Sequence, residues 1–212
     1  MKLNEKEALR YLGFRGKPAD ADTDEMIREI GGEMLRTLTP KCVYKRYDIK
    51  VFENAVELDG WRIESMKLSR HLRGCKAAYL FAATLGLQAD MMIRRLSALN
   101  MARGTVAHSV ANALIEDYCD EMQAQIAEKE AATGLFLKPR YSPGYGDFVL
   151  ESQKEIFARL ECAKRIGLTL TDTMMMVPFK SVTAVIGVTD TPTCTYIKCR
   201  GCANTDCEFR EI

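Results

Sequence analysis

The sequence predicts an α+β domain built on an antiparallel or mixed sheet, and three observations lead to this fold class. Residues 43–64, VYKRYDIKVFENAVELDGWRIE, alternate polar and apolar side chains around an Asp-Gly pair that is typical of a hairpin turn. Residues 76–84 and 180–190 are apolar runs typical of buried strands. Helical patterns separate these strands without a regular strand-helix repeat.

Two helices are predicted before the hairpin. The first fits residues 4–12 and ends at a glycine. The second fits residues 24–38, with Thr23 or Asp22 as its N-cap, and Pro40 stops it.

Three further helices are predicted after the run at 76–84. Residues 85–99 have helical spacing, the longest helix lies between about 104 and 131, and residues 151–166 form another that ends at Gly167. Apolar side chains recur every four residues in the longest helix and predict its core face. A polar line on the flank of that face is placed to meet solvent or a ligand: Ser109, Asn112, Glu116, Asp120 and Gln123.

Composition and charge exclude several classes of function. The chain has 212 residues, of which 47% are hydrophobic and 28% charged, as in ordinary globular proteins. Thirty Lys and Arg against 29 Asp and Glu give a net charge of +1, so no overall field favours nucleic acid or an anionic membrane. The N-terminus lacks the uninterrupted apolar region of a signal peptide or membrane span, and we expect a cytoplasmic protein.

Several catalytic and nucleotide-binding motifs are missing. The chain has no Walker-type phosphate loop, no GxGxxG after a strand and no GxSxG. His71 and His108 each stand alone, and a lone histidine in a helical stretch is more often a packed or solvated side chain than a general base.

The segment RYSPGYGD, which begins at Arg140, has the composition of a loop that binds something. Gly144 and Gly146 permit positive φ angles and a close approach of the backbone to a ligand. Arg140 offers a planar fork for a carboxylate, and Tyr141 or Tyr145 offers a face for a flat ring or a cation. A zwitterionic ligand with an aromatic base would meet all of these groups. The alternative is a tight turn whose arginine pairs with any nearby acid.

This loop belongs to a longer pattern. Arg-x-x-Pro-Gly-Tyr at 140–145, a helix of about fifteen residues and the segment GLTLTDTMMMVPFKSVTAVIG together resemble the activation domain of cobalamin-dependent methionine synthase over roughly residues 104–190. The resemblance implies a C-shaped α+β domain with a bent antiparallel sheet. It also implies a repair function, as a component of a methyltransferase system. Such a domain presents S-adenosylmethionine while a flavodoxin-type donor supplies an electron, so that inert cob(II)alamin returns to methylcobalamin.

The resemblance also implies roles for individual residues. Arg140 would bind the methionine carboxylate, and Tyr141 would contribute its backbone beside it. Tyr145, in the turn with Gly144, would shape the pocket over the ligand or the corrin. Glu116, on the long helix, would meet the ammonium or sulfonium charge, the alternative being a solvated helix carboxylate.

The chain departs from the family pattern in two places. The paired tyrosines that follow the last strand in the family have no clear counterpart, and Tyr196 is a loose substitute. The D-x-H-x-x-G signature of cobalamin-binding enzymes is missing. We therefore expect the cobalamin to be held by a separate methionine synthase or another corrinoid protein.

The C-terminal residues predict a metal site. Four cysteines with the spacing C-x4-C-x2-C-x4-C fit an iron–sulfur cluster or a structural zinc, and an unoccupied tail is the third alternative: Cys194, Cys199, Cys202 and Cys207. The scattered Cys42, Cys75, Cys119 and Cys162 are expected in the core. We expect a single domain over residues 1–190 followed by a cysteine-rich tail at 191–212.

Two functions of different classes agree with these patterns. The first is a reactivation factor that binds S-adenosylmethionine and a corrinoid protein and supports reductive methylation. The second is a non-catalytic adaptor, a metal-stapled module whose tail docks partners and whose loop at 140–147 is structural.

Overall fold

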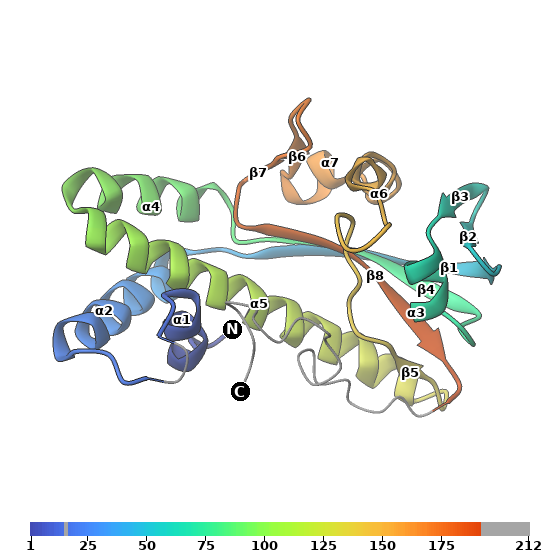
Figure 1. Cartoon of the computed structure of the whole chain (residues 1–212), viewed down its shortest axis with the longest axis horizontal. Helices are drawn as coiled ribbons and strands as arrows, with labels where there is room; N and C mark the ends of the chain where they lie inside the picture. Colours follow the sequence, from blue (N-terminus) through green and yellow to red (C-terminus); the bar gives the residue numbers. More distant parts are fainter. Residues whose placement is uncertain (15–16, 192–212) are drawn as a thin grey trace.

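The protein is built on a six-stranded antiparallel sheet with strand order β3-β2-β1-β4-β8-β5 (Figure 1). The structure is a computed structural model that describes residues 1–14 and 17–191. Its strands are β1 (Lys41–Val51), β2 (Ala55–Leu58), β3 (Trp61–Glu64), β4 (Ala77–Thr84), β5 (Phe136–Leu137) and β8 (Ser181–Thr189), with β6 (Thr169–Leu170) and β7 (Met176–Val177) forming a separate hairpin. The predicted α+β class is confirmed, and every strand pair within the described ranges is antiparallel.

Helices cover both faces of the sheet (Figure 1). One layer contains α1 (Glu5–Tyr11), α2 (Ala21–Thr37), α4 (Leu87–Leu99) and α5 (Met101–Ala131), and the other contains α3 (Met66–His71), α6 (Gln153–Leu160), which follows a 3-10 turn (Leu150–Ser152), and α7 (Cys162–Ile166). The long helix α5 runs beneath the sheet and confirms the longest helix predicted from the sequence. Its N-cap is Asn100, whose side chain accepts from the backbone N–H of Arg103.

The sheet separates two apolar cores, which explains why β4 is buried along its whole length. Tyr79 and Phe81 belong to the core between the sheet and α5. Leu80 and Ala82 belong to the core between the sheet and α3, α6 and α7. Successive strand residues point to opposite faces, so a strand covered on both sides must be apolar throughout. The buried strands predicted at 76–84 and 180–190 are therefore confirmed.

The start of the second helix differs from the prediction. Asp20 is the N-cap of α2, because its side chain accepts from the backbone N–H of Thr23 at 2.8 Å. The prediction of Thr23 or Asp22 as the cap was wrong, since both residues lie inside the helix.

The helix predicted over 151–166 is broken in two. Glu161 has a left-handed φ of 51° and separates α6 from α7. A continuous helix would turn Cys162 roughly 200° away from Leu160, yet both side chains are buried against the sheet. The break brings the apolar side of the second segment back onto the core, and Gly167 ends it as predicted.

Candidate functional site

The segment that carries Arg140 extends the edge of the sheet. Beyond β5, the backbone N–H of Lys138 donates to Gly187 at 2.8 Å. Tyr141 and Val185 exchange two hydrogen bonds, of 2.9 and 2.8 Å, as an isolated bridge on β8. The Tyr141 backbone, predicted to lie beside a ligand, is therefore already bound to the sheet, which leaves only the second lone pair of its carbonyl oxygen for another contact.

The Arg140 side chain reaches α5 and meets three residues of the predicted polar line. Its Nη2 lies 2.9 Å from Oε2 of Glu116 and 2.7 Å from Oδ1 of Asp120, and its Nη1 donates to the amide oxygen of Gln123 at 3.0 Å. The side chain is only 8% exposed. The family resemblance gave Glu116 a role at the positive charge of the ligand and gave none to Asp120 or Gln123, although both belong to the same helix flank.

The tyrosines lie on the other side of this segment. The Tyr141 ring stacks against Phe148 with centroids 6.3 Å apart and lies 5.0 Å from the ring of His71 on α3. Tyr145 is 6.3 Å from Tyr141 and is mostly exposed. Arg140 contacts α5, whereas the tyrosines lie on the α3 side of the sheet. A ligand that touches both Arg140 and Tyr145 must therefore lie across the edge of the sheet formed by residues 138–141.

Two contacts hold the loop against α3. The carboxylate of Asp147 accepts from the backbone N–H of Met66 at 2.8 Å and from the Ser65 hydroxyl. The Ser65 hydrogen bond, followed by those of the backbone, lowers the pKa of Asp147. On the other side, Nε2 of His71 lies 2.9 Å from the carbonyl oxygen of Pro139, and burial lowers the pKa of this histidine. His71 is therefore a packed side chain, one of the two structural roles expected for a lone histidine.

The loop requires its glycines. Gly144 and Gly146 have φ angles of 93° and 63°, a backbone region that other residues rarely adopt. A Cβ atom on Gly146 would also come within 2.4 Å of the Lys67 side chain and 3.0 Å of the Tyr141 hydroxyl. The positive φ angles predicted for both glycines are confirmed, and a close approach of this backbone to a ligand stays a prediction.

A second cation, from the turn before β8, lies against the same flank of α5. Lys180 is buried, and its Nζ donates to the Asn112 amide oxygen at 2.8 Å. Burial lowers the pKa of this lysine, and Asp90 partly offsets the effect. Asp90 also accepts from the backbone N–H of Phe179, which fixes the turn before β8. Lys180 lies in the segment at 167–187 that resembles the family, but a single lysine there did not indicate a site residue.

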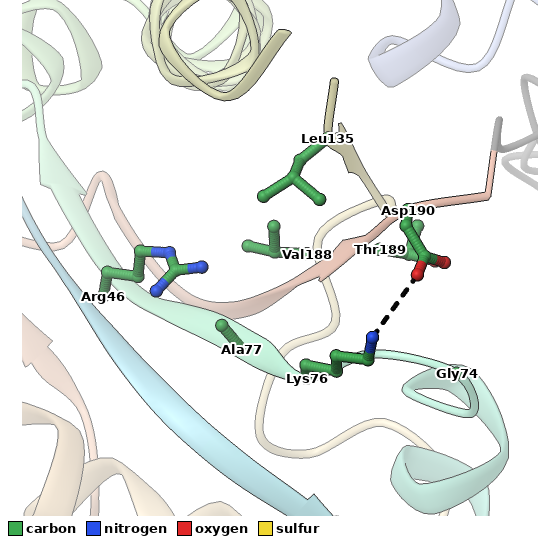
Figure 2. Close-up of a pocket in the computed structure, with 8 residues that line it drawn as sticks. All are labelled: Arg46, Gly74, Lys76, Ala77, Leu135, Val188, Thr189 and Asp190. Carbon is green, nitrogen blue, oxygen red and sulfur yellow. Dashed lines mark ion pairs between the residues drawn. The ribbon is translucent and has the colours of Figure 1, made fainter. Parts of the chain in front are cut away.

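A small pocket opens at the C-terminal end of β8. Figure 2 shows Arg46 at one end, the ion pair between Lys76 and Asp190 at the other, and Leu135 and Val188 between them. Its volume is about 120 Å³, whereas sites for ligands of drug-like size occupy roughly 300–1,000 Å³. The pocket therefore suits a few water molecules or a small ion better than a nucleoside.

The cysteines of the described ranges are free thiols. Cys75, Cys119 and Cys162 are buried and Cys42 is half-buried, as predicted for core positions. Burial raises the pKa of Cys42 and of Cys162 to about 12, so both are poor thiolates at neutral pH. Residues 1–14 and 17–191 contain no cluster of three or more metal-ligating side chains. The predicted ligands Cys194, Cys199, Cys202 and Cys207, together with Tyr196, lie outside the described residues.

No helix within the described part of the chain has the length and apolar character needed to cross a bilayer.

Comparison with known proteins connects this geometry to a family. The crystal structure of the MetH reactivation domain bound to AdoHcy matches with a TM-score of 0.60 and 18% sequence identity, covering 89% of this chain and 67% of that one. The likeness shows the same fold. No curated protein matches the chain. The family model of the vitamin B12 dependent methionine synthase activation domain matches residues 79–208. The sequence resemblance, taken to end before the cysteine tail, was therefore too short, since the match reaches the four tail cysteines. Since this match spans more than half of the sequence, the chain belongs to the vitamin B12 dependent methionine synthase activation domain family.

Proposed function

We propose that this chain binds S-adenosylmethionine beside Arg140 and supports reductive methylation of cobalamin on a separate methionine synthase or another corrinoid methyltransferase. Membership of the activation domain family and the shared fold with a reactivation domain bound to AdoHcy support the proposal. The observation that carries it is the contact between Arg140 and Glu116. A loop cation and a helix anion, 24 residues apart in the sequence, lie 2.9 Å from each other.

Opposite charges at this position suit an amino acid. The Arg140 guanidinium would donate to the carboxylate of the ligand, and the Glu116 carboxylate would accept its ammonium or face its sulfonium. Each side chain would exchange one partner of opposite charge for another. No buried charge is left unpaired by that exchange, which keeps its cost low.

The aromatic edge of the loop would bind the other end of the ligand. Tyr145 is 66% exposed, and its ring would offer a face for the adenine base or for the corrin of the partner. The preceding Gly144 has a φ of 93° and would set the direction of this tyrosine. Reaction would then take place at a surface shared with the corrinoid protein.

The protein contributes binding and orientation of the methyl donor. When it is held by the partner, cobalamin supplies the methyl acceptor, after a flavodoxin-type donor has supplied one electron. Transfer of the methyl group from the sulfonium leaves a neutral thioether in the site. Because methyl transfer consumes the reduced form, it makes the unfavourable reduction proceed.

The proposal extends to residues 191–212. The four cysteines of this tail would hold either an iron–sulfur cluster, which would serve as an electron port, or a structural zinc, which would fold the tail. Thiolate ligands of this kind are expected in a reducing cytoplasm.

The first test is calorimetric titration of oxygen-protected protein with S-adenosylmethionine. Wild type should show saturable one-site binding, and Arg140→Ala should weaken it by roughly 10- to 100-fold, the usual contribution of a charge-assisted contact. Arg140→Lys keeps the charge but loses the planar fork, so it should also weaken binding. Glu116→Gln should weaken binding as well, because the amide no longer matches the positive charge.

A matched control is Arg103→Ala on the same helix α5. Arg103 forms a bidentate ion pair with Glu29, at 2.7 and 3.0 Å, and does not contact Arg140. Its loss should leave affinity unchanged. Equal affinity of wild type and a folded Arg140→Ala protein would remove Arg140 as the carboxylate clamp. No detectable binding by wild type, alone or with a corrinoid protein, would favour the adaptor function.

A further inference from the structure

Asp120 covers part of Arg140 that the proposed ligand needs. Nη2 of Arg140 contacts Asp120 at 2.7 Å and Glu116 at 2.9 Å, so one nitrogen meets two carboxylates. The other end of the guanidinium, Nη1, donates to the neutral amide oxygen of Gln123 at 3.0 Å. One positive and two negative charges leave this group of side chains with a net charge of −1.

The two carboxylates differ in exposure. The side chain of Glu116 is 36% exposed and that of Asp120 is 67% exposed, against 8% for Arg140. Asp120 also lies one helical turn after Glu116, on the same face. It is therefore the outer of the two carboxylates. Because Asp120 is the more exposed carboxylate, water and salt screen its contact with Arg140 more than that of Glu116, so the Asp120 contact is the easier to exchange.

We propose that Asp120 is a built-in competitor that the carboxylate of the ligand displaces from Arg140, and that its charge restricts the site to ligands carrying both a carboxylate and a cation. The inference rests on the proposed function. A simple carboxylate would place three anions around one guanidinium. A zwitterion brings its own cation to the carboxylate of Glu116 and so offsets the added negative charge.

Substitution of Asp120 by Asn separates the two effects of this side chain. The amide keeps the size of the carboxylate and can still accept from Arg140, but it no longer competes as an anion. S-adenosylhomocysteine is the most informative probe, because it has the carboxylate and the ammonium but lacks the sulfonium charge, whose attraction to Asp120 would offset part of the gain. 5′-Methylthioadenosine is the control ligand, since it keeps the nucleoside and the thioether and lacks the amino acid end.

The experiment is calorimetric titration of wild type, Asp120→Asn and Glu128→Gln with both ligands. Asp120→Asn should bind S-adenosylhomocysteine about two- to fivefold more tightly than wild type, the range expected for an exposed ion pair. Its affinity for 5′-methylthioadenosine should equal that of wild type. Glu128 is an exposed carboxylate two helical turns further along α5, so Glu128→Gln makes the same charge change away from Arg140 and should alter neither affinity.

The outcomes separate this inference from the proposed function. If wild type binds S-adenosylhomocysteine, Arg140→Ala does not, and Asp120→Asn binds equally well or less well than wild type, the competitor role is overturned and the proposed function stands. An equal gain with 5′-methylthioadenosine also overturns it, because no carboxylate is then displaced. Binding by Asp120→Asn alone supports it. Absence of binding in all variants removes the proposed function and this inference together.

Discussion

The Tyr79 hydroxyl on β4 donates to the buried carboxylate of Glu130, near the C-terminal end of α5, at 2.6 Å. Arg46 lies 3.3 Å from the same carboxylate oxygen. Burial, followed by the hydrogen bond to Glu130, raises the pKa of Tyr79 to about 12. The neutral phenol is therefore favoured in the folded protein over the unfolded chain, where tyrosine titrates near pH 10.

This shift predicts a loss of stability in alkali. The folded state retains the Tyr79 proton between about pH 10 and 12 while the unfolded chain releases it, so stability is complete below pH 10 and falls through this window. Tyr79→Phe should therefore show a smaller fall in urea midpoint from pH 9 to pH 11 than wild type. The exposed Tyr145→Phe is the control and should keep the wild-type fall. An identical pH dependence in Tyr79→Phe and wild type would contradict the prediction.

The break between α6 and α7 is the clearest case at the scale of an element. Glu161 adopts the left-handed conformation with φ 51° and ψ 44°. That conformation is unfavourable for a residue with a Cβ atom. Its side chain forms an exposed ion pair of 3.8 Å with Lys164. The burial of Cys162 and Ile166 against the sheet holds this backbone in place.

Glycine should therefore be tolerated better than glutamate at this position. We expect Glu161→Gly to raise the free energy of unfolding by about 0.5–1 kcal/mol, because it removes the Cβ clash. Glu155→Gly, the same substitution inside α6, should lower it by about 1 kcal/mol. Urea denaturation of the two variants measures both changes. Destabilisation by both would show that Glu161 is not strained.

At the scale of the whole molecule, the candidate site lies at the edge of the sheet, beside β8. Residues 138–141 cover the outer edge of β8 (Figure 1). From this short segment, Arg140 reaches the α5 layer and Tyr141 reaches the α3 layer. A ligand at this edge would contact side chains that pack against both helical layers. This position suits a domain whose proposed task is to present a ligand to a partner.

The cysteine tail leads to a prediction for the complete chain. Protein purified without oxygen should contain iron with visible absorbance, or about one equivalent of zinc, if the four thiolates form a site. Cys202→Ala should lose most of that metal. Cys42→Ala, a change at a half-buried thiol on β1, should retain it. A colourless, metal-free and fully active protein would dismiss both versions of the site.

Much of the fold could be predicted because its elements are encoded locally. The Asp59-Gly60 turn joins β2 to β3 as expected, and both residues have positive φ. The apolar runs became the central strands β4 and β8, and the four-residue apolar period became α5. Local patterns failed in two places. The α2 cap at Asp20 is a local contact with Thr23, and residue type alone did not choose among the neighbouring side chains that could cap the helix. The break at Glu161 depends on packing against the distant surface of the sheet.

The sequence by itself determined the α+β class and the family pattern around Arg140, because spacing and residue type carry that information, and the resemblance to the family singled out Glu116 on the long helix. Only the tertiary structure decided that Asp120 and Gln123 share the same guanidinium and that Arg140 and Tyr141 serve opposite layers. Those contacts depend on the register of residues 138–141 against β8. Register is a long-range property set by the packing of both cores.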